Sequence, residues 1–120
     1  MYKRGAGEYR RGARARFPQV RYQLRIYRLK PETADEFVEL WRRDIVPTRR
    51  KLGFGVVGAW RRAEGSEFIW MVRWDGQGSF DEGESAYYAS PERAAMTWDP
   101  ADYIASSQLR VIGAVEGFEV

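Results

Sequence analysis

The sequence has no cysteine, no histidine and no asparagine. Without cysteine it has neither a disulfide framework nor a thiol nucleophile. Without histidine it lacks the commonest general base and the commonest metal and haem ligand, which excludes haem degradation through a histidine ligand. The carboxylates Asp81, Glu82 and Glu84 do not have the spacing of a calcium loop, so we expect no metal and no cofactor.

Long hydrophobic runs are also missing. No apolar stretch approaches the roughly 20 residues that a membrane span needs, and the N-terminus has no apolar core typical of a secretory signal. Hydrophobic residues nevertheless make up 44% of the 120 residues and aromatic residues 15%, enough for one folded domain with a single core. We therefore predict a soluble, cytoplasmic, single-domain protein without a membrane span.

Positive charge is concentrated at the N-terminus. The net charge is +3, yet residues 1–20 hold six basic residues and one acidic residue, which leaves residues 21–120 slightly acidic. We predict a basic, flexible extension over residues 1–20, a domain over residues 21–120, and no nucleic-acid partner. The alternatives are an arm that binds nucleic acid or an anionic membrane, and an organellar transit peptide.

One long helix followed at once by a strand organises the chain. Thr33, with Glu36 three residues later, has the pattern of a capping box, and Gly53 supplies a residue that ends helices in the left-handed conformation. Pro47 interrupts the pattern and predicts a kink or short break after Val46. Apolar side chains recur at three- and four-residue spacing and predict one buried face, made of Phe37, Leu40, Trp41, Ile45, Thr48 and Leu52.

Period-two alternation predicts four strands. In the first, Tyr22, Leu24 and Ile26 share one face, and Gln23, Arg25 and Tyr27 share the other. The second contains Gly58, which predicts a bend or bulge, and the short link to the third predicts an antiparallel hairpin. The predicted strands are residues 21–29, 54–60, 67–74 and about 107–118.

Two further helices are predicted between the third and fourth strands. Ser79 and Glu82 form a second capping-box pattern, and Ser90 followed by Pro91 has the pattern of another helix start. The element order is then β-α-β-β-α-β, which predicts an α+β, ferredoxin-like fold with a four-stranded antiparallel sheet and helices on one face. Both faces of the strand at residues 67–74 carry large apolar groups, so we expect a homodimer whose sheets face each other.

Several motifs resemble the NIPSNAP family over roughly residues 21–112. The most specific are Ile45-Val46-Pro47 followed by Gly53-Phe54, and Gly58-Ala59-Trp60 at the end of the second strand; residues 22–31, 73–75 and 87–92 continue the resemblance. The resemblance implies a dimeric α/β barrel, in agreement with the predicted element order. The chain departs from the family where the third strand often carries His-Leu-Trp, because residues 70–72 read Trp-Met-Val.

A candidate ligand site follows from polar side chains on predicted strands. We expect a mainly apolar pocket between helices and sheet or at the barrel mouth, with Arg25 and Tyr27 as polar contacts, because guanidinium is a permanently charged fork for carboxylates or enolates. Arg73 is a second candidate for the same role. Aromatic walls are expected from Trp60, Trp70 and Tyr87. The alternatives are a structural ion pair of Arg25 or Arg73 with Asp44 or Glu67, and tryptophans that serve only the core and the dimer interface.

Two classes of function remain open. The basic residues at positions 42–43 and 49–51, four arginines and Lys51, are interpreted as a solvated helix face, with an anion-binding patch as the alternative. No acid–base constellation is evident, which favours a binding module that holds a small apolar or aromatic ligand or a protein partner. The alternative is a cofactor-free monooxygenase or isomerase that acts on a small aromatic or polyketide-like substrate. Whether the chain is an enzyme is left open.

Overall fold

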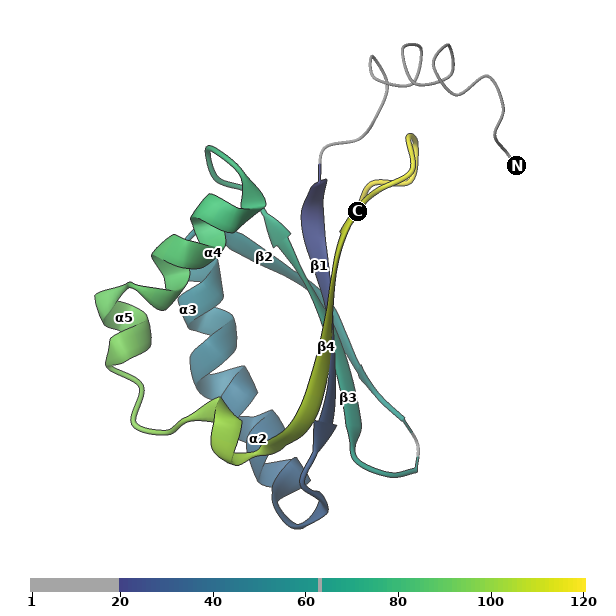
Figure 1. Cartoon of the computed structure of the whole chain (residues 1–120), viewed down its shortest axis with the longest axis vertical. Helices are drawn as coiled ribbons and strands as arrows, with labels where there is room; N and C mark the ends of the chain where they lie inside the picture. Colours follow the sequence, from purple (N-terminus) through teal and green to yellow (C-terminus); the bar gives the residue numbers. More distant parts are fainter. Residues whose placement is uncertain (1–19, 63) are drawn as a thin grey trace.

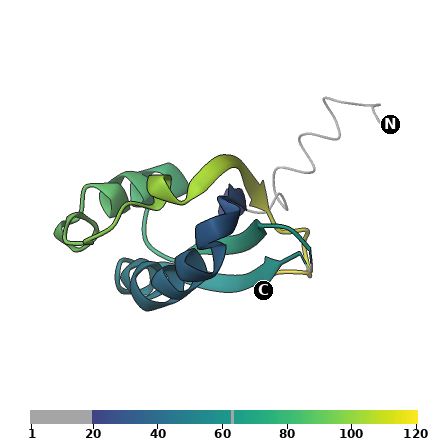
Figure 2. The same cartoon turned by 90° about the horizontal axis from the view of Figure 1, so that it is seen from below.

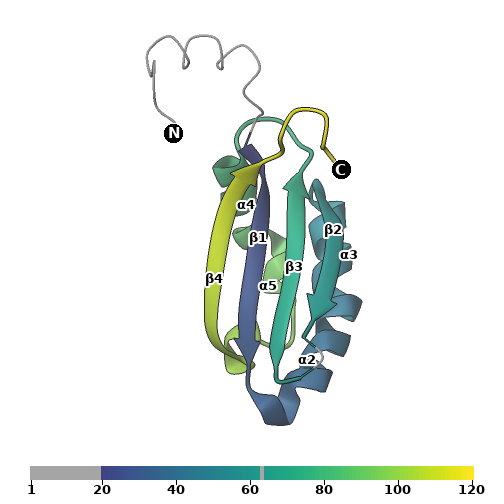
Figure 3. The same cartoon turned by 90° about the vertical axis from the view of Figure 1, so that its right-hand side faces the viewer.

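The computed structural model describes residues 20–62 and 64–120. It is built on one antiparallel sheet with the strand order β2-β3-β1-β4 (Figure 3). The strands are β1 (Val20–Leu29), β2 (Phe54–Arg61), β3 (Glu67–Trp74) and β4 (Ile104–Gly113). This is the predicted α+β, ferredoxin-like arrangement. The predicted N-terminal extension lies outside the described residues apart from Val20, with which β1 starts.

The helices cover one face of the sheet (Figures 1 and 2). The first group runs without interruption through the 3-10 turn η1 (Pro31–Thr33), α2 (Ala34–Leu40), the π-helical segment η2 (Trp41–Ile45) and α3 (Val46–Lys51). The second group consists of α4 (Phe80–Tyr88), α5 (Pro91–Ala94) and the 3-10 turn η3 (Pro100–Asp102). No helix in the described part of the chain is long and apolar enough to cross a membrane.

The predicted capping box at Thr33 is wrong. The Thr33 side chain makes no capping hydrogen bond, and its backbone (φ −122°, ψ 17°) is not extended as a capping residue's usually is. The chain instead enters the helix through η1, whose carbonyl at Pro31 accepts from the Ala34 N–H. Glu36 is therefore free to accept a hydrogen bond from the Tyr103 hydroxyl, at 3.1 Å.

Pro47 perturbs the long helix on its N-terminal side. The break predicted after Val46 lies before it, where the Val46 N–H reaches back five residues to the Trp41 carbonyl. Proline has no N–H to donate, so a carbonyl in the preceding turn loses its usual helical donor. In the next turn the Thr48 hydroxyl donates to the Asp44 carbonyl, at 2.7 Å. The helix ends as predicted at Gly53, whose φ of +97° is a left-handed conformation that glycine adopts without strain.

The other predicted boundaries fare unequally. Both features of the Ser79 capping box are present, and the Ser90 hydroxyl accepts from the Arg93 N–H at 3.0 Å, so these helix starts are confirmed. The fourth strand is shifted from its predicted position, since β4 begins at Ile104 and ends at Gly113. Beyond it a turn at Gly117 (φ +90°) brings the Val120 carbonyl near β1 and β3, over whose ends Figure 3 shows the tail passing.

The core lies between the sheet and the helices. The strict alternation predicted for β3 is observed: its even-numbered side chains are buried against the helices, and Ile69, Met71 and Arg73 are only partly covered. Phe37, on α2, is fully buried and packs edge-on against Phe68, with ring centroids 5.7 Å apart. The helix-facing side chains of β3 are Phe68, Trp70, Val72 and Trp74.

Candidate functional site

A cavity of about 420 Å³ opens between the helices and the sheet. It is lined by β1 and β3 on the floor, by η2, α3 and α4 on the helical side, and by η3 and the first half of β4 at the mouth. The side chains that matter for its chemistry are Arg25, Tyr27, Arg49, Trp70, Tyr87 and Tyr88.

Four of the six predicted site residues meet in this cavity, namely Arg25, Tyr27, Trp70 and Tyr87. Strand register explains the meeting of two of them, because Arg25 lies directly opposite Trp70 on neighbouring strands and on the same sheet face. The polar side chains of β1 thus face the helices, and the sheet face that lines the cavity is the one carrying residues 23, 25 and 27.

The other two predicted residues, Trp60 and Arg73, lie on the opposite sheet face. In β2 a register shift between Val56 and Gly58 adds one residue to the strand, close to the bulge predicted at Gly58. A bulge inverts the alternation that follows it, so Trp60 points away from the helices and is 52% exposed. Arg73 forms an ion pair with Asp75, at 2.6 Å, outside the cavity.

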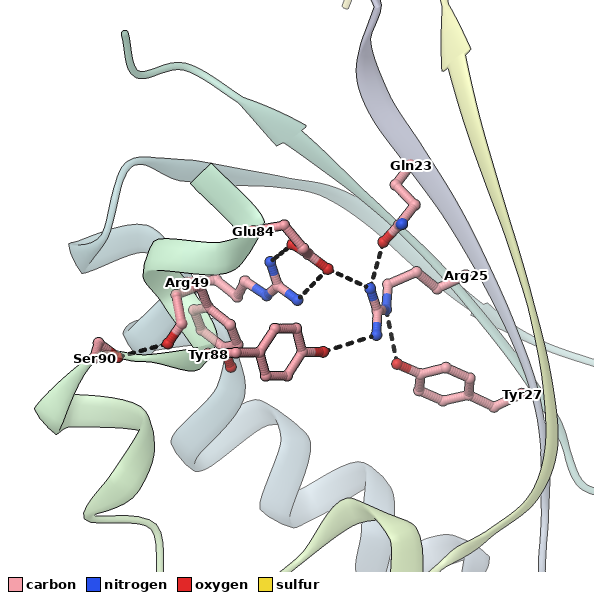
Figure 4. A network of polar contacts seen from close by, with 8 residues as sticks. Gln23, Arg25, Tyr27, Arg49, Glu84, Tyr88 and Ser90 are labelled. Atoms are coloured by element: carbon pink, nitrogen blue, oxygen red, sulfur yellow. Dashed lines mark hydrogen bonds and ion pairs between the residues drawn. The ribbon is translucent and has the colours of Figure 1, made fainter. Parts of the chain in front are cut away.

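Arg25 is the centre of a polar network that joins β1 to α4 (Figure 4). Its Nε donates to the Tyr27 hydroxyl at 2.8 Å, one Nη donates to the Tyr88 hydroxyl at 3.2 Å, and the other donates to Gln23 and to Glu84, the latter at 3.1 Å. Burial works to lower the pKa of Arg25, but Tyr27, Tyr88 and Glu84 outweigh it and raise that pKa above its ordinary value. Arg25 is therefore a permanent cation.

Arg49 is a second buried cation, and its interpretation as part of a solvated face is wrong. It is 1% exposed; its guanidinium lies 3.8 Å from the centroid of the Tyr87 ring and 4.6 Å from that of Phe54. It also forms an ion pair with Glu84, at 2.6 Å. The signal that marks it is spacing, because Arg49 follows the buried Ile45 by one helical turn.

Glu84, which lies on α4, forms ion pairs with both Arg25 and Arg49. One carboxylate oxygen accepts from Arg49 at 2.6 Å, and the other accepts from Arg25 at 3.1 Å and from Arg49 at 3.4 Å, so a single acidic side chain bridges two guanidiniums (Figure 4). The Ser79 cap fixes where α4 starts, and Gly83 lets the helix lie close to the sheet, since a Cβ there would meet the Trp74 ring at 2.7 Å. Neither Glu84 nor Tyr88 was among the predicted site residues.

The arginines do form ion pairs, but not with the expected partners. Arg25 pairs with Glu84 across 59 residues of sequence, and Arg73 pairs with the nearby Asp75. The carboxylates that the sequence suggested pair elsewhere, Asp44 with Arg43 and Glu67 with Arg62. Within residues 20–62 and 64–120, no group of three or more carboxylates is placed to hold a metal ion.

Burial also acts on the tyrosine that stacks on Arg49. It raises the pKa of the Tyr87 hydroxyl, and the nearby Arg49 opposes this only in part, so Tyr87 stays neutral at physiological pH. The cavity therefore offers the phenol groups of three tyrosines and two guanidiniums, which Glu84 bridges from outside the lining. Such groups bind and orient a ligand. The one carboxylate that lines the described cavity, that of Asp99 at its mouth, accepts a hydrogen bond from the Ala101 N–H at 3.0 Å.

Comparisons with solved structures show the same fold. An uncharacterised NIPSNAP domain protein from Burkholderia xenovorans aligns with a TM-score of 0.70 at 14% identity, over 82% of this chain and 98% of its own. A NIPSNAP family protein from Agrobacterium tumefaciens aligns at 0.69 and 18% identity, over 80% and 86%. A Nitrosomonas europaea protein with a proposed assignment as an antibiotic biosynthesis monooxygenase aligns at 0.65 and 14% identity, over 84% and 96%.

These identities are low enough to show the fold alone. A comparison with curated proteins finds no match. The match to a family model is more specific, because the NIPSNAP model matches residues 22–116. This range includes all the helices and strands of the described chain, apart from the first two residues of β1. The resemblance first noted in residues 45–47, 53–54 and 58–60 is thereby confirmed, and the chain belongs to the NIPSNAP family.

Proposed function

We propose that the chain is a homodimeric domain that binds a small, flat, mainly apolar ligand in the cavity between its sheet and helices. The observation that carries the proposal is the cavity itself, which has an aromatic wall and a few convergent polar groups. Trp70 and Tyr87 supply the wall, and Arg25 and Tyr27 supply polar groups that fix a ligand's orientation. We also propose that the domain is cytoplasmic.

The open face of the sheet supports the dimer. Figure 3 shows this face without a covering helix, and it carries Leu24 and Ile26 from β1 beside Ile69 and Met71 from β3 (Figure 3). Trp60 is half exposed at its edge. This apolar strip is bordered on β4 by Gln108 and Arg110, and a second copy with the same face would cover it.

An enzymatic role is the second candidate. The observation in its favour is the fold shared with the Nitrosomonas europaea protein, together with two tyrosine hydroxyls held by one guanidinium. A cofactor-free monooxygenase or isomerase needs a group that removes a proton from its substrate. The carboxylate of Glu84 is held in two ion pairs and does not line the cavity, and that of Asp99 at the mouth accepts from the Ala101 N–H. Binding is therefore the better-supported function.

Native mass spectrometry tests both parts of the proposal in one experiment. We expect the purified chain at micromolar concentration to give a dimer mass, and the dimer to take up one naphthoate per subunit when this flat aromatic carboxylate is added. A folded monomer that binds naphthoate would reject the dimer only. A dimer that takes up neither naphthoate nor any other flat aromatic compound of similar size would reject the ligand site.

A further inference from the structure

We propose that the cavity selects ligands with a single negative charge, a carboxylate or an enolate on an aromatic frame, held by Arg25 and by the hydroxyl protons of Tyr27 and Tyr88. The inference rests on the proposed ligand-binding function and adds the ligand's charge and the groups that recognise it. Three features of the described residues carry it: the charge balance, the direction of the hydrogen bonds and the donors left without an acceptor.

The charge balance comes first. Arg25 and Arg49 are both buried, and they share one carboxylate, that of Glu84. At the mouth, Arg93 and Asp99 line the same cavity and offset each other. With Glu84 counted, the described groups around the cavity carry a net charge of +1, because two buried guanidiniums share one carboxylate. A buried charge of this kind is costly until an anion pairs with it, so a monoanion is the ligand that completes the site.

The direction of the hydrogen bonds is the second feature. The hydroxyl oxygens of Tyr27 and Tyr88 both accept from Arg25, which leaves each O–H proton to donate to something else. Tyr27 is only 5% exposed and lines the cavity, and within the described chain its hydroxyl donates to no acceptor. Two hydroxyl donors that a cation already polarises suit an anionic oxygen better than a neutral one.

Unused donors are the third feature. A guanidinium has five N–H groups, and the contacts of Arg25 occupy four of them, which leaves one N–H on the nitrogen that contacts Tyr88. The Nε of Arg49 is buried and has no partner among the described residues. Donors therefore outnumber acceptors around the cavity, as expected for a site that receives an oxyanion.

The rival explanation is a structural network that only ties α4 to β1 and α3. A structural network has no preference for the charge of a ligand, whereas a recognition site does. The test therefore measures the preference itself, by isothermal titration calorimetry of the full chain with three probes of one size and shape: naphthoate, the neutral naphthamide and the cationic naphthylmethylammonium, each substituted at the same ring position.

We expect naphthoate to bind about tenfold or more tightly than naphthamide, because hydrogen bonds to a charged acceptor are stronger than those to a neutral one. The cation should bind most weakly. Equal affinities for all three probes would overturn the charge selection and leave the ligand-binding proposal standing. Binding of none of them would overturn both.

Variants distinguish side chains that recognise the ligand from side chains that only stabilise the fold. Tyr27→Phe and Tyr88→Phe keep the rings and remove the donors, so each should reduce the ratio of naphthoate to naphthamide affinity severalfold. Tyr88 is half exposed, which makes Tyr88→Phe informative even if Tyr27→Phe unfolds. Arg43→Gln is the matched control, since it removes an exposed guanidinium on the outer helix face and should leave the ratio unchanged. An unchanged ratio in both tyrosine variants would contradict the proposal.

Discussion

Replacing Trp41 by alanine should destabilise the domain by about 3–5 kcal/mol, which is enough to unfold much of a small domain at physiological temperature. Trp41 is 7% exposed and packs edge-on against Phe68 and Trp70, with ring centroids 5.0 and 5.4 Å away. Truncation therefore leaves a cavity at the centre of the core, beside the floor of the ligand site. Urea unfolding followed by circular dichroism measures the loss.

Two companion variants sharpen this test. Trp41→Phe should cost much less, because it keeps an aromatic ring and removes an indole N–H that is buried without a partner among residues 20–62 and 64–120. Arg43→Ala lies on the same helix but is 63% exposed, and its effect should stay within about 0.5 kcal/mol. Comparable losses for Trp41→Ala and Arg43→Ala would mean that the buried face of the helix is misassigned.

Glu84→Gln should be about as damaging, at roughly 3 kcal/mol, because it leaves two buried guanidiniums facing each other without an anion. Arg49→Met should cost less, since Glu84 then keeps its pair with Arg25 and the cluster becomes neutral. The double variant Glu84→Gln with Arg49→Met should recover part of the stability lost in Glu84→Gln. Thermal melting of the three variants at low salt measures this order.

The order is a direct test of the charge balance in the cavity. If Arg49→Met destabilises the domain more than Glu84→Gln, the stacking of Arg49 on Tyr87 outweighs the uncompensated charge, and the argument for an anionic ligand loses its first support. If the double variant is worse than either single one, the two residues act independently of each other's charge.

Local patterns predicted the elements that local interactions determine. The predicted strand over residues 67–74 has the same bounds as β3, because its alternation is strict and turn residues lie on both sides of it. Gly53 ends the helix because few other residues adopt its backbone conformation without strain. The start at Thr33 failed because a 3-10 turn supplies an alternative entry into the helix that the capping-box pattern does not reveal.

The site was predictable only in part, for reasons of sequence distance and register. Arg25 and Tyr27 stand out because they are polar residues on a strand, but their partners Glu84 and Tyr88 lie about sixty residues further on, and no pattern in one sequence pairs them. The bulge in β2 moved Trp60 to the other face, which alternation alone does not predict. Arg49 was missed because its charge was given more weight than its helical spacing.

The most direct test of the account is an NMR titration of the chain with naphthoate, observed at the indole N–H signals of the five tryptophans. Trp70 lines the cavity and Trp60 lies on the open sheet face, so the two report on different sides of the sheet. We predict that naphthoate shifts the Trp70 signal and leaves the Trp60 signal in place. A shift of Trp60 with Trp70 unchanged would place the ligand on the open face and contradict the account.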